Sequence, residues 1–437
     1  MTGDAGVSLE EIARTLAFGG GYQTNLVIAG ATLLGFAAGV IGVFALLRKR
    51  SMTADALSHA TLPGIAIAFL AAAWLGVEGR SIIILLAGAA CTGSLGVVCI
   101  HVLAKHPRVT EDTAIGVVLS VFFGAGVVGL SIVQNHAPSG SGGIDAFIYG
   151  QAAAMQPEDV ALMVVIALAS VIATLVLLKE FTLVSFNDSF AQVTGWPVSA
   201  IDLAIMALVS VVTIAGLQAV GLIMVVALLI IPPVSARFWT DRLRALLAIA
   251  GLIGAVSGYL GSVVSASFPR LPAGSIIVLT SGVAFVISLL GAPRGVLASS
   301  ARRLSLRLRL AGDHFLELAH DAGTERVNPD SIRRLGKLRG WSAVFRTMVL
   351  VTLRWSGMIS GRSGADWVLT EAGVARGDRV ARNHALWERY LVTHADIAPS
   401  HVDWSVDQVE HVLGSELIAR LEAELAGSES ATTGGAR

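Results

Sequence analysis

Long apolar runs decide what this chain can fold into. Nine runs, each about as long as a membrane crossing, follow one another between Asn25 and Gly291. A helix needs roughly 20 apolar residues to cross ~30 Å of hydrocarbon, because it rises only about 1.5 Å per residue. Backbone groups in lipid must pair internally, and no barrel-like alternation is present, so we expect these runs to be helices. They cover Asn25–Leu47, Thr53–Val77, Ser81–Ala104, Thr113–Gln134, Asp159–Leu178, Ile201–Leu217, Gly221–Phe238, Leu246–Phe268 and Gly274–Gly291.

Charge separates this membrane part from the rest of the chain. Only 14% of the 437 residues are charged, against about 25% in soluble domains. The charges gather after Arg294, which predicts a soluble C-terminal tail. The net charge is zero, so no overall field attracts nucleic acid. The two cysteines, Cys91 and Cys99, share one apolar run, and we interpret them as packing residues.

The basic residues predict how the chain lies in the membrane. Short cytoplasmic loops carry an excess of lysine and arginine. Nine spans place Arg80 and Arg270 on one side and a larger basic set on the other, so this second side is predicted to be cytoplasmic. The N-terminus then lies outside and the tail inside. Short connections at 216–221 and 269–274 leave counts of eight or ten spans open. The larger set is Arg48, Lys49, Arg50, Lys105, Arg108, Lys179, Arg237, Arg242, Arg244 and Arg294.

The domain organisation follows from these shifts in composition. We predict an N-terminal extracytoplasmic segment over residues 1–22 and a transmembrane domain over 23–295. A basic linker helix over 296–312 alternates arginine with leucine, which suits a membrane surface. A cytoplasmic domain over 313–426 and a disordered tail over 427–437 complete the chain.

The cytoplasmic domain shows the order of a winged helix. Helical patterns over about 313–322, 329–336 and 343–356 are followed by a turn at 361–364 and a strand at 366–370. Three helices and a hairpin in this order are typical of that fold. The predicted fold class is therefore an all-helical membrane protein with about nine spans and a mainly helical winged-helix tail.

Ionisable groups at membrane depth are costly and mark functional sites. Asp55 and His59 lie near the start of the second run, four residues apart, and so face the same side of a helix. A carboxylate oxygen and an imidazole nitrogen make half a site for a divalent metal, and two chain copies would supply four ligands. A helix-start cap with an Asp–His hydrogen bond explains the same two residues.

The segment around this pair resembles the permeases of bacterial ABC importers for manganese, zinc and iron. The resemblance rests on Arg50-Ser51-Met52, on 55–60 (Asp-Ala-Leu-Ser-His-Ala) with Leu62-Pro63-Gly64, on Tyr149-Gly150-Gln151, and on 221–233. It covers about residues 20–295, and it implies that Asp55 and His59 are the metal ligands in transit.

The same resemblance implies the partners. The cytoplasmic loop 187–195 lies where the family's coupling helix enters its ATPase, and Asp188, Ala191 and Gly195 are the matched coupling positions. The chain contains no G-x-x-x-x-G-K-[ST] phosphate loop, so the permease is not expected to be an enzyme. The resemblance implies two copies of a separate ATPase, an extracytoplasmic metal-binding lipoprotein and a second permease, identical or closely related, in a bacterial plasma membrane.

The tail carries a second set of metal-ligand residue types. His384 and Glu388 are four residues apart, as are Asp407 and His411, and Glu410 lies beside them. Residues of these types at such spacing can bind a divalent metal. Pairs of this kind also occur on ordinary solvated helix faces, and spacing alone favours that interpretation.

Residues 313–425 resemble the iron- and manganese-dependent bacterial repressors. The resemblance implies that His384, Glu388, Asp407, Glu410 and His411 are metal ligands. A carboxylate rather than cysteine at Asp407 favours manganese. Asp403 stands where iron sensors carry histidine, which alters one site.

We therefore predict a manganese importer permease with a metal-sensing cytoplasmic domain and no resident cofactor. The alternatives within the family are zinc or iron import. Two alternatives of other classes are a proton-driven metal transporter and a membrane-tethered, metal-responsive DNA-binding regulator. Nucleic acid is not among the expected partners.

Overall fold

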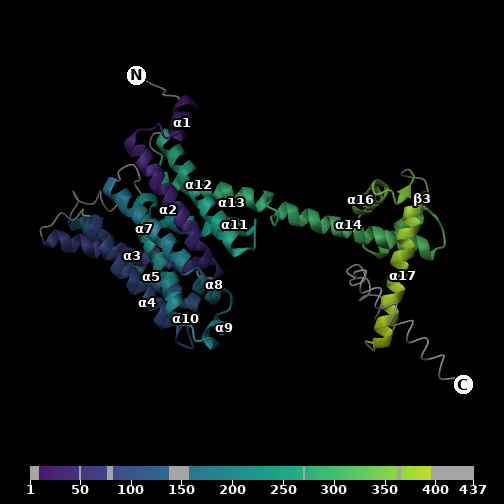
Figure 1. The fold of residues 1–437 in the computed structure, drawn as a ribbon, viewed down its shortest axis with the longest axis horizontal. Helices are drawn as coiled ribbons and strands as arrows, with labels where there is room; N and C mark the ends of the chain where they lie inside the picture. The colour runs from purple at the N-terminus through teal and green to yellow at the C-terminus, as the bar shows by residue number, and fades with distance from the viewer. Residues whose placement is uncertain are drawn as a thin grey trace. The chain divides into compact units, whose positions relative to one another are not determined.

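The structure is a computed structural model of the whole chain, and it describes residues 9–48, 51–75, 82–136, 157–268, 271–361 and 366–394 (Figure 1). The chain divides into two compact units, Met1–Ala298 and Ser299–Arg437.

The first unit consists of helices. A short helix α1 (Leu9–Leu16) precedes the apolar ones. The bounds of the others are α2 Tyr22–Leu47, α3 Ser51–Trp74, α4 Ile82–Ala104, α5 Glu111–His136, α7 Pro157–Val176, α8 Leu178–Phe186, α9 Asp188–Val193, α10 Val198–Val220, α11 Leu222–Arg237, α12 Leu243–Ser267 and α13 Ala273–Gly291.

Each of the nine predicted runs lies on a helix. Seven helices in the described residues are long and apolar enough to cross a membrane. The fifth run is shared by α7 and α8, which are bent by 66° and together form an eighth candidate. The seventh run is α11, a shorter apolar helix of 16 residues. It is separated from α10 by Gly221, whose φ of +87° favours glycine.

Small residues allow the apolar helices to approach closely. In Figure 1, α2 lies beside α12, while α3, α4 and α5 form a neighbouring group. Gly35 and Gly39 of α2 meet Gly254 and Ala250 of α12 backbone to backbone. Gly64 of α3 meets α4 in the same way. Lipid provides no hydrophobic drive between helices, so close contact of this kind has to stabilise the bundle.

The second unit is a winged helix. It contains α14 (Val296–Asp321), α15 (Pro329–Leu338), α16 (Ala343–Trp355) and α17 (Glu371–His394). Three short strands, β1 (Arg326–Val327), β2 (Ile359–Ser360) and β3 (Trp367–Leu369), pair antiparallel in the order β1-β3-β2. The core gathers Phe315, Val349 and Trp367, among others. The predicted fold class is thus confirmed for both parts, although the described residues give seven or eight long candidate spans against the nine predicted.

One boundary differs from the sequence-based expectation. The predicted basic linker helix and the first helix of the winged domain form one continuous helix, α14. Gly312 lies at the predicted break, but a glycine only weakens a helix. A Cβ at Gly312 would come within 3.1 Å of Leu353, so its small size serves packing against α16.

Candidate functional site

The second and third turns of α3 place Asp55 and His59 side by side. The Nε2 atom of His59 lies 3.5 Å from Oδ1 of Asp55. This is an ion-pair distance and is too long for a well-formed hydrogen bond. Because α3 begins at Ser51, Asp55 is also inside the helix and not at its capping position. The geometry therefore disfavours the helix-cap interpretation of this pair.

The surroundings of His59 hold its ring while leaving it accessible. Phe123 of α5 meets the imidazole edge to face, with ring centroids 4.9 Å apart at 79°. The side chain of His59 is 18% exposed and that of Asp55 is 46% exposed. The neighbouring Leu57, Ser58 and Ala60 are buried. In the described residues, the buried Nδ1 atom of His59 has no hydrogen-bond partner.

Two donors per chain are too few to enclose a metal. Across the described part of the chain, no group of three or more His, Cys, Asp or Glu side chains is arranged to hold a metal ion. Asp55 and His59 thus offer one oxygen and one nitrogen ligand, open on one side. An open, incomplete set suits an ion that must leave again.

The predicted coupling segment, residues 187–195, forms a short helix with an anchored middle and exposed ends. The Asn187 side chain accepts a hydrogen bond of 2.9 Å from the backbone N–H of Phe190, which starts α9. Ala191 is fully buried. The segment ends at Gly195, whose φ is +84°. Phe190 and Val193 are exposed, so α9 presents apolar side chains outward.

The tail brings His384 of α17 against α14. Nδ1 of His384 lies 2.8 Å from Oε1 of Glu317, and Nδ1 of His314 lies 3.6 Å from the other carboxylate oxygen, Oε2. Burial raises the pKa of Glu317, but hydrogen bonds and charges from the two histidines outweigh it and lower that pKa to about 2. Glu317 is therefore a carboxylate at neutral pH, held between two imidazoles.

The sequence analysis did not identify His314 and Glu317. The signal was present, because a His-x-x-Glu spacing puts both residues on one face of a helix. Glu388 lies on the same helix as His384, four residues later. Asp403, Asp407, Glu410 and His411 lie outside the described residues.

A neighbouring ion pair fixes the two helices against each other. Arg376 of α17 donates to both carboxylate oxygens of Asp313 on α14, at 2.9 and 2.8 Å. Donating these hydrogen bonds to Asp313 raises the pKa of Arg376. This bidentate ion pair helps to fix the relative position of α14 and α17, and therefore also supports the contact between Glu317 and His384.

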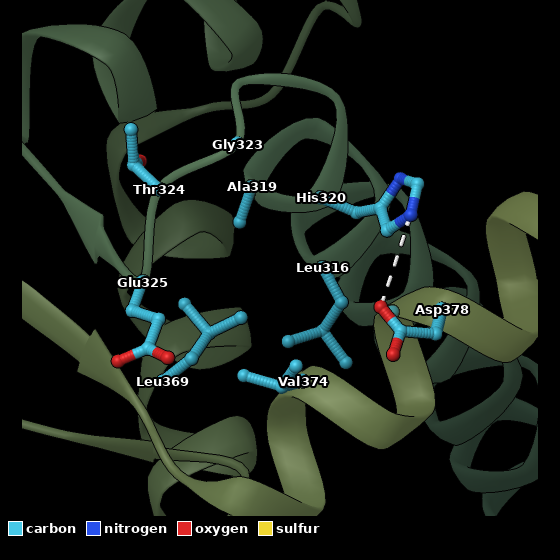
Figure 2. A pocket seen from close by; sticks show the side chains of 10 residues that line it. Leu316, Ala319, His320, Gly323, Thr324, Glu325, Leu369, Val374 and Asp378 are labelled. Atoms are coloured by element: carbon cyan, nitrogen blue, oxygen red, sulfur yellow. Dashed lines mark ion pairs between the residues drawn. The ribbon is translucent and has the colours of Figure 1, made fainter.

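A separate cavity of about 220 Å³ lies near this pair (Figure 2). Its floor is apolar, from Leu316, Leu369 and Val374. Nε2 of His320 lies 3.8 Å from Oδ1 of Asp378 on one side, while Glu325 lies on the far side in Figure 2. The cavity contains none of the ligands predicted from the sequence.

Comparison with known proteins identifies both parts of the chain. Residues 22–292 match the ABC 3 transport family, and residues 370–435 match the iron dependent repressor metal binding and dimerisation domain. The manganese transport system membrane protein of Bacillus subtilis is 34% identical over 377 residues, covering 86% of each chain. This alignment is longer than the first unit, so it extends into the tail.

Two further matches cover the membrane part. The zinc transport system membrane protein of Treponema pallidum is 43% identical over 290 residues, which is 66% of this chain and 95% of that protein. The solved structure of PsaBC from Streptococcus pneumoniae in complex with Fab is similar with a TM-score of 0.57 and 27% identity. It covers 67% of this chain and all of the matched chain.

Proposed function

This chain belongs to the ABC 3 transport family, and from that premise we propose that it is the permease subunit of an ATP-driven importer of divalent metal ions. Its family was predicted correctly from the sequence motifs. The observation that carries the proposal is the Asp55–His59 pair on α3, a carboxylate and an imidazole 3.5 Å apart inside a candidate span. Placing ionisable groups in a membrane helix costs free energy, so such groups usually serve a function. Binding a metal ion during transport would be that function here.

Manganese is the proposed ion. Relatives are named for manganese and for zinc transport, and the more extensive match is to a manganese protein. An oxygen and a nitrogen ligand accept either ion, as well as iron. Two permease copies, identical or closely related, would surround the ion with two carboxylates and two imidazoles.

The proposed assembly has two ATPase copies on the cytoplasmic side and a metal-binding lipoprotein outside. The permease does not hydrolyse ATP in this proposal. α9 would contact the ATPase through Phe190 and Val193, with Asp188, Ala191 and Gly195 setting its position. The N-terminus would lie outside the plasma membrane and the tail in the cytoplasm.

Reconstitution tests this proposal directly. Vesicles containing the permease, its ATPase and its binding lipoprotein should accumulate manganese only when ATP is supplied. Zinc and iron, offered separately, should compete less well than manganese. Uptake that needs a proton gradient and no ATPase would contradict the proposal and favour a secondary transporter.

The tail is proposed to sense cytosolic metal. His384, Glu317 and His314 bring two imidazoles and one ionised carboxylate close to one another, and residues of these types bind manganese, zinc or iron. These three are not by themselves arranged to hold an ion in the described residues, so the proposed site needs further ligands. The bound ion would supply a charge that links α14 to α17. Glu388, Asp407, Glu410 and His411 are proposed as its further ligands.

Metal binding to the tail can be measured apart from transport. In full-length protein whose transit pair is disabled by Asp55→Ala, His384→Ala and Glu317→Gln should each weaken manganese binding by about tenfold. Equilibrium dialysis in detergent gives the affinity. His320→Ala is the matched control, because His320 is also paired with a carboxylate but lies in the separate cavity. Equal affinities in all variants would contradict this site.

The exposed face of α16 argues against the tethered DNA-binding regulator. Val344, Met348, Val351 and Trp355 follow one another at helical spacing, and all four are exposed, Trp355 to 89%. Base edges are read chiefly by hydrogen bonds, and of these four side chains only Trp355, through its indole N–H, can make one. We therefore propose regulation of transport as the function of the tail.

A further inference from the structure

One arginine joins three elements at the end of α2. Arg48 follows the last residue of α2, and its backbone N–H still bonds to the carbonyl of Phe44. Its guanidinium donates to Oδ1 of Asp202 on α10 at 3.2 Å and to the carbonyl oxygen of Val184 on α8 at 2.9 Å. A third contact, of 3.7 Å, reaches Oδ2 of Asp188, the first residue of α9.

These contacts differ in strength. The side chains of Arg48 and Asp202 are only 15% and 7% exposed. Each charge has therefore lost most of its contact with water and is stabilised mainly by the other. The Asp188 side chain is 54% exposed, and its contact is longer. Arg48 is therefore fixed firmly to α10 and reaches α9 by a weaker, adjustable contact.

The apolar packing beneath Arg48 supports this link. Phe44, one turn earlier on α2, meets Phe181 of α8 edge to face, with centroids 5.3 Å apart. Both rings are almost fully buried. The end of α2 and the helix that leads into α9 are thus packed together, and a shift of one displaces the other.

The same arginine lies close in sequence to the transit pair. α3 begins at Ser51, three residues after Arg48, and Asp55 follows one turn later. We propose that Arg48 is a positioning residue that transmits movement of α9 to the start of α3, and so to Asp55 and His59. This inference rests on the proposed function, because it takes α9 as the contact with the ATPase.

Asp188→Asn tests the link while leaving the buried Arg48–Asp202 pair intact. The full chain is assembled with its ATPase, and hydrogen exchange of residues 51–60 is compared with and without a non-hydrolysable ATP analogue. Wild type should show a nucleotide-dependent change in α3, and Asp188→Asn should lose most of it. Metal taken up per ATP hydrolysed should fall about fivefold, within the usual range of coupling energies.

Two further variants separate transmission from other effects. Asp241→Asn is the matched control, because it removes the carboxylate of another exposed ion pair, with Arg294. It should leave both measurements unchanged. Arg48→Lys should reproduce the loss of Asp188→Asn, and the double variant should lose no more than the larger single loss. Losses that multiply would mean that Asp188 acts through its own contact with the ATPase, which would overturn the proposal.

The exchange measurement keeps this inference distinct from the proposed function. A wild-type complex that moves no metal but shows the α3 response, lost in Asp188→Asn, would support the link and contradict the transport proposal. A complex that transports metal, but in which Asp188→Asn keeps the wild-type response of α3 and the wild-type ratio of metal to ATP, would support the transport proposal and contradict the link.

Discussion

His59→Ala is expected to lower ATP-driven manganese uptake by about 100-fold, which corresponds to about 2.7 kcal/mol. The substitution removes the nitrogen donor of the proposed transit pair and leaves Asp55 as its remaining donor. The fold should persist, because the imidazole is partly exposed and its Nδ1 has no hydrogen-bond partner in the described residues. Initial rates of manganese uptake into vesicles, at equal amounts of assembled complex, give the measurement.

Asp55→Asn should have a similar effect for a different reason. It keeps the shape of the side chain but removes the charge that holds a divalent cation. His101→Ala, on the last turn of α4, is the matched control and should transport like wild type. If uptake survives in both transit variants while ATP is still hydrolysed, the pair is structural and the metal passes elsewhere.

The spans could be predicted from the sequence because their signal is local. The run 113–134 corresponds to α5, Glu111–His136, and the run 25–47 to α2, Tyr22–Leu47. Length and apolarity suffice for this. They do not specify bends, so the 66° change of direction between α7 and α8 was not predicted.

The two proposed metal sites show the same difference between local and distant contacts. Asp55 and His59 are one helical turn apart, so their spacing alone places them together. Glu317 and His384 lie on different helices, and only the folding of α14 against α17 brings them to 2.8 Å. No periodicity in either helix encodes that contact. A carboxylate–histidine pair between two helices can therefore be identified only once their packing is known.

Gly254→Val is expected to destabilise the membrane unit by about 3 kcal/mol or more, beyond the usual cost of overpacking. A Cβ at Gly254 would overlap the backbone oxygen of Gly35 on α2 and lie 2.8 Å from its carbonyl carbon. Backbone atoms cannot rotate away as a side chain would, so α2 and α12 would have to separate. Thermal unfolding of the purified protein in detergent should show a large drop in Tm.

Gly282→Val on α13 is the control for this prediction. Apart from the nearby backbone of α13 itself, no described atom lies within 4 Å of a Cβ at that position, so the same added volume should leave Tm nearly unchanged. Comparable losses in both variants would mean that valine disturbs the helices themselves and not their contact. A loss confined to Gly254→Val would show that the bundle depends on backbone contact at α2, because helices in lipid gain little from apolar burial and much from close approach. α2 is also the helix that ends at Arg48, so a wider α2–α12 spacing should weaken coupling before it unfolds the protein.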